Sequence, residues 1–257
     1  MFTGPLPSTL FHLTNLNDLS LSSNQLNGSI PSEIGKLVNL QYLLLSSNMF
    51  TGPLPSTLFH LTNLNYLNLS SNKINGYIPQ EVGNLKNLIY LSLWNNSLTG
   101  PIPTAICNLT QLERLSLRQN QLSGSFPVGI GNLKNLIYLD LSFNNLTGPI
   151  ALSSGGWRMN YLDLSHNQLN GTIPNKICTL SFTILYLAYN NLSGSIPSSL
   201  RSCYLIDLSY NRLKGPVPDE LANHFSVGAF VGNQDLCSNV TAHPLPSAFM
   251  ISQLGSS

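Results

Sequence analysis

A chain of 257 residues with only 8% charged residues and a formal net charge of +1 has no basic excess of the kind that nucleic-acid-binding proteins carry. Ordinary soluble domains contain roughly 25% charged residues, so uncharged polar groups must cover this surface. No positively charged start precedes an apolar run, and no stretch reaches the roughly 20 apolar residues of a membrane span. We therefore expect no nucleic-acid partner, no signal peptide and no direct membrane span in this chain.

Asparagine recurs at a nearly constant spacing through most of the chain. Five steps of 24 residues are followed by steps of 23, 23 and 21, at Asn24, Asn48, Asn72, Asn96, Asn120, Asn144, Asn167, Asn190 and Asn211. Large aliphatic residues stand five and three residues before each asparagine, as at Leu19 and Leu21. This alternation predicts a short strand with one buried face in every repeat. A single repeat cannot bury its own leucines, so consecutive repeats must stack into a solenoid.

The residues after each asparagine predict how the chain returns to the next strand. Glycine follows four residues later, as at Gly28, and proline three residues after the glycine, with Ala151 as the one break. Glycine permits a tight backbone, and the Ile-Pro pair begins an extended segment that leads into a helical turn. The asparagine amide can hydrogen-bond its own turn and the next coil. We therefore expect parallel strands about 4.8 Å apart on an inner wall and short turns on an outer wall.

The combined pattern LxxLxxLxLxxNxLxGxIPxxLGxL resembles the plant-type extracellular leucine-rich repeats of receptor-like kinases and receptor-like proteins. The match covers residues 1 to about 221. The resemblance implies a right-handed leucine-rich-repeat superhelix, an α/β-type repeat solenoid with a parallel sheet on its concave face and short turns or 3-10 segments on its convex face. It divides the chain into a repeat array at 1–221, a degenerate C-terminal cap at 222–239 and a tail at 240–257 that we expect to be disordered. The array holds about nine 24-residue repeats and a partial first one.

The resemblance also implies a function. It indicates the ligand-recognition region of a plant cell-surface receptor in signalling, with a peptide or protein ligand and a co-receptor ectodomain as partners. Such a region is extracellular, and any kinase would belong to a domain outside this chain. One alternative is a secreted leucine-rich-repeat inhibitor of a pathogen cell-wall-degrading enzyme, of the polygalacturonase-inhibitor type. Another is a non-functional truncated receptor product. The array begins within a repeat and shows no capping cysteine pair, which favours a receptor fragment over the inhibitor.

The exposed positions of the inner wall change character in the middle of the chain. Tyrosine is frequent six residues before the asparagine, and Ser-Ser directly precedes the first three asparagines. The fourth to seventh repeats depart from this uniform surface, and we predict a ligand-binding patch there at Tyr90, Trp94, Arg114, Arg118, Gln119, Tyr138, Phe143 and His166. Exposed Trp, Tyr and Arg are enriched at binding hot spots. Arg114 and Arg118 suit a carboxylate, such as a peptide C-terminus or an acidic side chain. The alternative is an ordinary solvated wall.

The sequence contains no motif that predicts catalysis. It lacks the Gly-rich loop with its lysine, the His-Arg-Asp motif and the Asp-Phe-Gly motif, so we do not expect a kinase. Asp140, Asp163 and Asp207 share one strand column, which allows a carboxylate pair of the retaining-glycosidase kind or a contact for a basic ligand group. Leu-Asp-Leu-Ser is, however, an ordinary form of this strand in the family. The histidines lack metal-ligand spacing, so we expect neither a metal nor a cofactor.

Asn-x-Ser/Thr sequences suit a secreted glycoprotein. The candidate glycosylation sites are Asn27, Asn68, Asn95, Asn108, Asn145, Asn170, Asn191 and Asn239. Asn68 and Asn95 fall on the expected inner wall, so glycans there would shape or block a ligand surface.

The four cysteines are too few to define a disulfide scaffold. Cys107 and Cys178 occupy one column three repeats apart, roughly 14 Å at strand spacing, which is too far for a disulfide. Cys203 replaces a core leucine of the outer wall, and we predict that it is a buried thiol. Cys237 lacks the second cysteine that usually follows it in the C-terminal cap of the related receptors.

Overall fold

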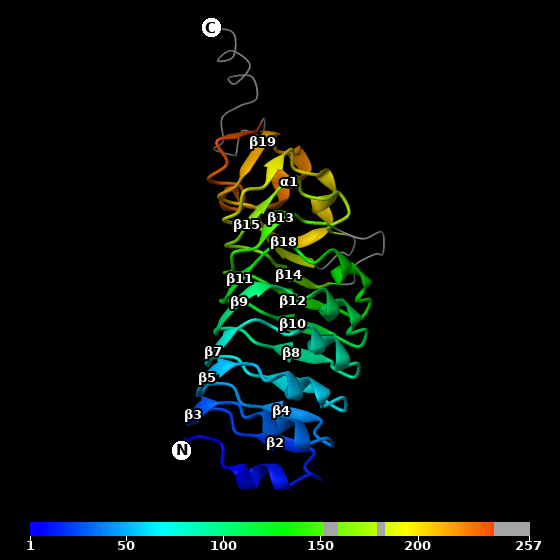
Figure 1. Ribbon diagram of the computed structural model, residues 1–257. Coiled ribbons are helices and arrows are strands. Elements are labelled where there is room, and N and C mark those ends of the chain that lie inside the picture. The colour runs from blue at the N-terminus through cyan, green and yellow to red at the C-terminus, as the bar shows by residue number, and fades with distance from the viewer. Residues whose placement is uncertain (152–158, 179–182, 239–257) are drawn as a thin grey trace.

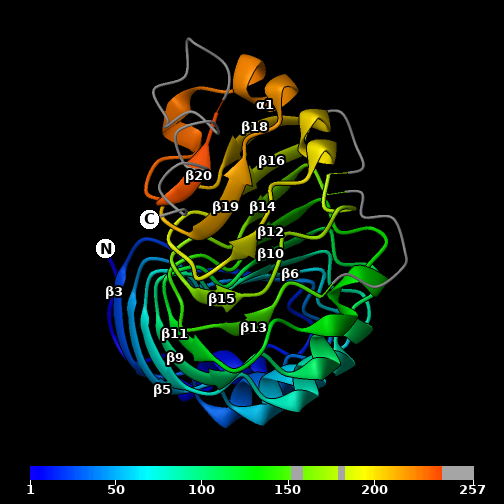
Figure 2. The same cartoon turned by 90° about the horizontal axis from the view of Figure 1, so that it is seen from above.

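The computed structural model describes residues 1–151, 159–178 and 183–238. These residues form a stack of coils that advances in one direction from the N-terminal to the C-terminal end (Figure 1). We call the recurring asparagines the ladder asparagines and number the coils by them, from coil 1 with Asn24 to coil 9 with Asn211. The view along the stack separates an inner wall of strands from the helical turns outside it (Figure 2). The predicted leucine-rich-repeat solenoid is therefore confirmed.

A parallel sheet of nine strands forms the inner wall among the described residues. Its strands, in order along the stack, are β2 (Asp18–Ser20), β4 (Tyr42–Leu44), β6 (Tyr66–Asn68), β8 (Tyr90–Ser92), β10 (Arg114–Ser116), β12 (Tyr138–Asp140), β14 (Tyr161–Asp163), β16 (Thr183–Tyr186) and β18 (Cys203–Asp207). Equivalent repeat positions pair directly across most of this sheet, as Arg114 does with Tyr90 and Tyr138. Each column of the sequence pattern is thus a row of side chains along the solenoid.

The alternating leucines of the strands point into one continuous core. Leu91 and Leu93 of coil 4 and Leu115 and Leu117 of coil 5 are all buried in it. Fully burying one such side chain contributes about 1.5–3 kcal/mol relative to leaving it exposed. Because each coil covers the leucines of its neighbours, the core exists only in the stack.

Short 3-10 helices form the outer wall. They are η1 (Ser8–His12), η2 (Ser32–Lys36), η3 (Ser56–His60), η4 (Gln80–Asn84), η5 (Thr104–Asn108), η6 (Val128–Asn132) and η7 (Ser198–Ser202). A proline in an extended conformation precedes each of them, as Pro103 does before η5 with φ −64° and ψ 136°. The fixed φ of proline suits this entry into a helical turn. The predicted short turns of the convex face are confirmed.

A second set of parallel strands covers the flank of the solenoid, and the sequence analysis did not predict it. Among the described residues they form a six-stranded, a two-stranded and a three-stranded sheet: β1 (Thr3–Gly4), β3 (Gln25–Ser29), β5 (Met49–Pro53), β7 (Lys73–Gly76), β9 (Ser97–Pro101) and β11 (Gln121–Ser123); β13 (Thr147–Pro149) and β15 (Gln168–Asn170); β17 (Ser193–Gly194), β19 (Arg212–Pro216) and β20 (Asp235–Cys237). The recurring glycine lies inside most of these strands, at φ 75° in Gly28 and Gly52. Glycine is uncommon within strands, so the pattern was not recognised as one.

The ladder asparagines connect each coil to the one before it. In coil 6 the Asn144 amide nitrogen donates to the carbonyl of Leu117 in coil 5 (3.0 Å) and to those of Leu141 (3.1 Å) and Ser142 (3.2 Å) in its own turn. Its side-chain oxygen accepts from the backbone N–H of Leu122 in coil 5 (3.0 Å). One buried amide therefore satisfies four backbone groups that the sharp bend leaves without partners. The expected bond of each amide to its own turn is confirmed, but the other coil that it bonds is the preceding one and not the next one.

The residue before each ladder asparagine adopts the left-handed conformation. In the described ranges, the non-glycine residues with positive φ are Ser23, Ser47, Ser71, Asn95, Gln119, Phe143, His166, Tyr189 and Tyr210, at 52° to 59°. Such a conformation costs about 1–3 kcal/mol and persists where surrounding contacts enforce it. The asparagine that follows supplies those contacts, because its amide bonds fix the bend.

The C-terminal coil continues the ladder beyond the last asparagine in the sequence prediction. Asn233 donates to the carbonyls of Leu208 (3.1 Å) and Phe230 (2.9 Å) and accepts from the N–H of Leu213 (3.0 Å). The preceding residue is Gly232 at φ 76°, where an added Cβ would lie 2.7 Å from Cδ1 of the Tyr210 ring. Glycine is needed there because the Tyr210 ring occupies that space.

Two short helices precede this coil, α1 (Asp219–His224) and η8 (Val227–Ala229). The boundary predicted at residue 221 falls within α1, and the division into array and cap stays a prediction. The tail at 240–257 and the candidate glycosylation site Asn239 lie outside the described residues.

The prediction that Cys203 is a buried thiol is wrong, because Cys203 forms a disulfide with Cys178. The two Cα atoms are 5.7 Å apart and the residues are 25 positions apart in sequence. Cys107, the equivalent of Cys178 in another repeat, lies too far away to bond it, whereas Cys203 stands where η7 of a later repeat ends and β18 begins, beside Cys178. Cys107 and Cys237 are free, and burial raises the pKa of the Cys107 thiol.

We expect Asn144→Ala to lower the free energy of unfolding by about 3 kcal/mol, because it removes a buried amide and leaves backbone groups in two coils without partners. Urea unfolding followed by circular dichroism measures this change. The neighbouring Asn145→Ala is the matched control, since Asn145 is exposed, and its change should stay within about 0.5 kcal/mol. Equal losses in the two variants would contradict the role assigned to the ladder.

Candidate ligand-binding site

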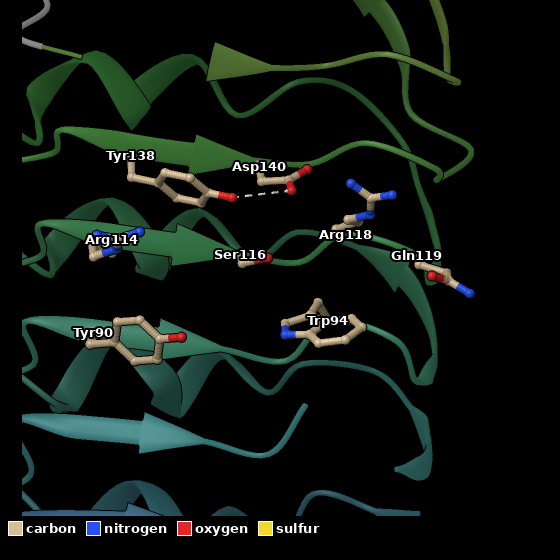
Figure 3. A pocket seen from close by; sticks show the side chains of 8 residues that line it. All are labelled: Tyr90, Trp94, Arg114, Ser116, Arg118, Gln119, Tyr138 and Asp140. Atoms are coloured by element: carbon tan, nitrogen blue, oxygen red, sulfur yellow. Dashed lines mark hydrogen bonds between the residues drawn. The ribbon is translucent and has the colours of Figure 1, made fainter. Parts of the chain in front are cut away.

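A cavity of about 410 Å³ opens on the concave wall at coils 4 to 6. Three neighbouring strands and the residues just after them supply its lining, which consists of Tyr90, Trp94, Arg114, Ser116, Arg118, Gln119, Tyr138 and Asp140. Figure 3 shows Arg114 on the middle strand and Arg118 just beyond it, with Tyr90 and Trp94 on one side and Tyr138 and Asp140 on the other. Six of the eight residues predicted for the ligand-binding patch thus line one cavity.

The hollow arises from a change of residue type in the tyrosine column. Tyr42 and Tyr66 stack at 5.1 Å between ring centroids, and Tyr138 and Tyr161 at 4.4 Å. Arg114 occupies the same column between Tyr90 and Tyr138, and its guanidinium lies 4.7 Å from the centroid of the Tyr138 ring. A flexible side chain has replaced a ring in the stack, which leaves space on the wall.

The two guanidinium groups of the cavity have aromatic rather than acidic neighbours. Arg118 lies 5.0 Å from the ring centroid of Phe143, as Arg114 does near Tyr138. Within the described ranges neither arginine forms an ion pair. Their N–H groups are therefore available to a ligand, while the ring faces hold the side chains in place.

Phe143 and His166, the other two predicted residues, lie outside the cavity in a second aromatic stack. His166 is sandwiched between Phe143 at 4.0 Å and Tyr189 at 4.3 Å, and Tyr189 stacks on Tyr210 at 4.3 Å. All four occupy the position directly before a ladder asparagine. The predicted patch ended at His166 and did not include the two tyrosines, although the same spacing before a ladder asparagine identifies them.

Asp140 is the buried acid of the cavity. Its Oδ1 accepts from the backbone N–H (3.0 Å) and the hydroxyl (2.6 Å) of Ser142, and its Oδ2 lies 3.5 Å from the Tyr138 hydroxyl that donates to it. Burial raises the pKa of Asp140, and the Ser142 bonds and the Arg118 charge oppose that rise. Asp163 repeats the arrangement in coil 7, with Ser165 and Tyr161 as donors.

The predicted patch did not include Asp140 and Ser116, although both line the cavity. They stand four residues before their ladder asparagines, in the strand column that alternation places on the same face as the tyrosines. Asn68 occupies this column in coil 3 and accepts the same two bonds, from the N–H (3.1 Å) and hydroxyl (2.7 Å) of Ser70. The hydrogen bonds of this position therefore do not depend on a charged group.

The candidate glycosylation sites differ in their accessibility. Asn27, Asn108, Asn145 and Asn170 are exposed, and Asn191 is half-buried on the flank. The two inner-wall candidates are half-buried and hydrogen-bonded, since Asn95 donates to Ser71 (3.3 Å) and Asn68 accepts from Ser70. Their use as glycosylation sites stays a prediction.

Family models match most of the chain. A leucine-rich repeat region model matches residues 58–148, and a leucine-rich repeat model matches residues 15–37, 39–61, 158–180 and 181–203. A search of curated protein sequences found no match.

Solved structures extend the match to nearly the whole chain. The ectodomain of the membrane receptor kinase GASSHO1/SCHENGEN3 from Arabidopsis thaliana is 35% identical with a TM-score of 0.80, and the alignment covers 96% of this chain and 32% of that one. The Arabidopsis receptor kinase HAESA is 35% identical with a TM-score of 0.88, over 93% of this chain and 41% of that one. A plant ice-binding protein is 33% identical with a TM-score of 0.82, over 95% of this chain and 79% of that one.

The chain therefore belongs to the leucine-rich-repeat family, in the form found in plant receptor-kinase ectodomains. It spans about a third of the length of the GASSHO1/SCHENGEN3 ectodomain and about two-fifths of that of HAESA. Across residues 1–151, 159–178 and 183–238, no helix has the length and apolar character that crossing a membrane requires. The same ranges contain no group of three or more His, Cys, Asp or Glu residues placed to hold a metal ion.

We expect Asp140→Asn to keep the fold and to raise the melting temperature at pH 7 by about 2–4 °C. Because the pKa of Asp140 is raised in the folded state, the folded protein binds this proton more tightly than the unfolded chain does. Ionised Asp140 therefore opposes folding above that pKa, and the opposition disappears as the pH falls through it. Thermal unfolding between pH 4 and pH 8 measures the difference, which should vanish at the acidic end.

Asp207→Asn is the matched control, since Asp207 holds the same column but is only half-buried, with Oδ1 accepting from Ser209 N–H at 3.0 Å. Its melting temperature should change less. A lower melting temperature for Asp140→Asn at pH 7 would show that the fold needs this carboxylate.

Proposed function

We propose that this chain is the ligand-recognition region of a plant cell-surface receptor, acting in signalling, and that it binds a peptide or protein ligand on its concave wall. The observation that carries the proposal is the cavity at coils 4 to 6, where two unpaired guanidinium groups and the Trp94 and Tyr138 rings meet. Residues of these types dominate binding energy at interfaces because they combine apolar area with directed hydrogen bonds.

The solved relatives support the same function. The GASSHO1/SCHENGEN3 ectodomain is in complex with CASPARIAN STRIP INTEGRITY FACTOR 2, and HAESA is in complex with the peptide hormone IDA and the co-receptor SERK1. By analogy, the ligand of this chain is a peptide and its second partner a co-receptor ectodomain, both outside the cell. The two arginines offer a carboxylate site for a peptide C-terminus or an acidic side chain.

Peptides that bind the unmodified protein can be selected from a random 12-residue library. We expect the double variant Arg114→Ala with Arg118→Ala to bind these peptides at least about tenfold more weakly, because charge-assisted hydrogen bonds contribute about 1.5–3 kcal/mol each. Fluorescence polarisation with synthetic copies of the selected peptides measures the change. Arg201→Ala is the matched control, since this arginine is exposed in η7 on the convex face. The proposal fails if no peptide is enriched, or if the double variant binds as tightly as the control.

A second candidate function is ice binding, by analogy with the plant ice-binding protein of which this chain spans 79%. The feature that favours it is a row of small uncharged polar residues along the flank strands, at Asn27, Thr51, Asn75, Thr99, Ser123, Thr147, Asn170 and Ser193. Thr99 and Thr147 each donate to a glycine carbonyl of the preceding coil at 3.2 Å, which fixes their orientation. Each of these coils contributes one such group, and neighbouring flank strands pair with a constant two-residue offset, as Thr51 does with Lys73, so the groups form a regular pattern that can order water.

We expect an ice-recrystallisation assay to distinguish the two candidates. If ice is the ligand, the unmodified protein inhibits recrystallisation and Thr51→Lys with Thr99→Lys abolishes the inhibition, because long charged side chains break the regular row. Thr104→Lys, at an exposed position of η5, should have no effect. Ice crystals that grow equally with and without the unmodified protein would exclude this candidate.

A further inference from the structure

The concave wall brings opposite charges together without pairing them. Arg118 of coil 5 and Asp140 of coil 6 line the same cavity, and Figure 3 shows the Asp140 carboxylate at the end of the cavity where Arg118 lies. Asp140 pairs across the strands with Asp163 of coil 7. In the described part of the chain neither acid forms an ion pair, and serine and tyrosine groups donate the hydrogen bonds that the two carboxylates accept. The wall thus changes from basic to acidic within three coils.

The fold does not require these charges. The column of Asp140 holds serine in coils 4 and 5 and asparagine in coil 3, and Asn68 forms the same two hydrogen bonds there. Asp140 and Asp163 are 2% and 5% exposed, and burying a carboxylate without a cationic partner is unfavourable. Only 8% of the chain is charged, yet coils 5 to 7 place four charged residues on this part of the wall. Packing does not explain this concentration of charge.

The two kinds of charge restrict which ligand can bind. A ligand that carries only a carboxylate gains hydrogen bonds from Arg118 but is repelled by Asp140 in the same cavity. A ligand that carries only an ammonium group is attracted by Asp140 but repelled by Arg118. A ligand with both charges in the matching order places each charge beside an opposite one. The cavity therefore favours it over ligands with a single charge or with the two charges reversed.

The spacing of the coils defines how far apart the ligand's charges lie. The midpoint between coils 6 and 7 lies about 7 Å along the stack from coil 5, since neighbouring strands are about 4.8 Å apart. In an extended peptide, residues two positions apart project on the same side and are about 6.6 Å apart. A peptide that runs along the stack can therefore place one charge at coil 5 and the other between the two aspartates.

We propose, building on the proposed function, that the cavity recognises an extended peptide segment in which an acidic and a basic residue stand two positions apart. The acidic side chain binds Arg114 and Arg118. The basic side chain lies against Asp140 and Asp163, with the Tyr138 and Tyr161 rings beside it. The tyrosine hydroxyls donate to the aspartates, and an ionised carboxylate has further lone pairs that can accept from another donor.

An array of capped ten-residue peptides tests this proposal with the full chain. Each peptide has a neutral Ala/Ser/Pro host with one Asp and one Lys at separations of one to five residues, in both orders. Peptides with Asp alone, Lys alone or neither complete the array. We expect the strongest binding for a separation of two residues in one of the two orders, at least about tenfold above any peptide with a single charge.

Three variants assign the charges to their sites. Asp140→Asn with Asp163→Asn should remove the dependence of binding on Lys while the dependence on Asp remains. Arg118→Gln should remove the dependence on Asp. Asp207→Asn is the matched control, since this residue holds the same column in coil 9, two coils beyond Asp163, and the variant should bind like the unmodified protein. Circular dichroism of each variant verifies the fold.

The outcomes separate this inference from the proposed function. Binding that follows Asp alone, or that Asp140→Asn with Asp163→Asn leaves dependent on Lys, overturns the charge-pair inference while peptide recognition stands. A folded protein that binds no peptide of the array, yet binds peptides selected from the random library, also overturns the inference alone. Failure with both the array and the library overturns the proposed function and the inference together.

Discussion

The hydrogen bonds of the ladder asparagines are the interaction on which the rest of the structure depends. Each amide joins its own bend to the preceding coil, and the bend is too sharp for the backbone to satisfy its own polar groups. The leucine core supplies most of the stabilising free energy, but leucines alone do not specify register, because apolar contacts have no direction. The amide bonds do, and they repeat in every coil as far as Asn233.

This constant register determines what the concave wall can display. Equivalent positions meet across neighbouring strands, so a side-chain type that repeats becomes a continuous stack, as in the tyrosines of coils 2 to 4 and in the rings from Phe143 to Tyr210. A departure from the repeated type interrupts a stack. The cavity is such an interruption, since Arg114 occupies the place of a tyrosine and the backbone beneath it is unchanged. Recognition and folding therefore depend on different columns of the same repeat.

Much of the fold followed from the sequence because its signals are local and recur. The leucine alternation predicted the inner strands, and the Pro positions predicted the outer turns. The flank strands were missed because the glycine at φ near 75° breaks the alternation that identifies strands. The Cys178–Cys203 disulfide was missed because Cys203 lies in a shortened repeat, where the equivalence between columns fails. The first error comes from a glycine that recurs in every repeat, and the second from a departure from the repeat that comparison of equivalent positions cannot detect.

The site was predicted to a similar extent and for a similar reason. Six of its lining residues were found by their departure from the Ser-Ser and Tyr pattern. Asp140 was considered as a contact for a basic ligand group but was left out of the patch, since Leu-Asp-Leu-Ser is a common strand sequence and the burial of this carboxylate beside Arg118 emerges only from three-dimensional packing. Distances between charges on different coils depend on the stacking, and no single repeat contains them.

The replacement of one ring by Arg114 also has a consequence for how such proteins change. A cavity made by side chains on an unchanged backbone is independent of the total number of coils. Gain or loss of a whole repeat at either end would shift the cavity relative to that end by one strand spacing and leave its lining intact. The number of coils and the ligand preference can therefore change independently. A protein of this architecture can acquire a new specificity through exposed side chains of the wall while its fold stays intact.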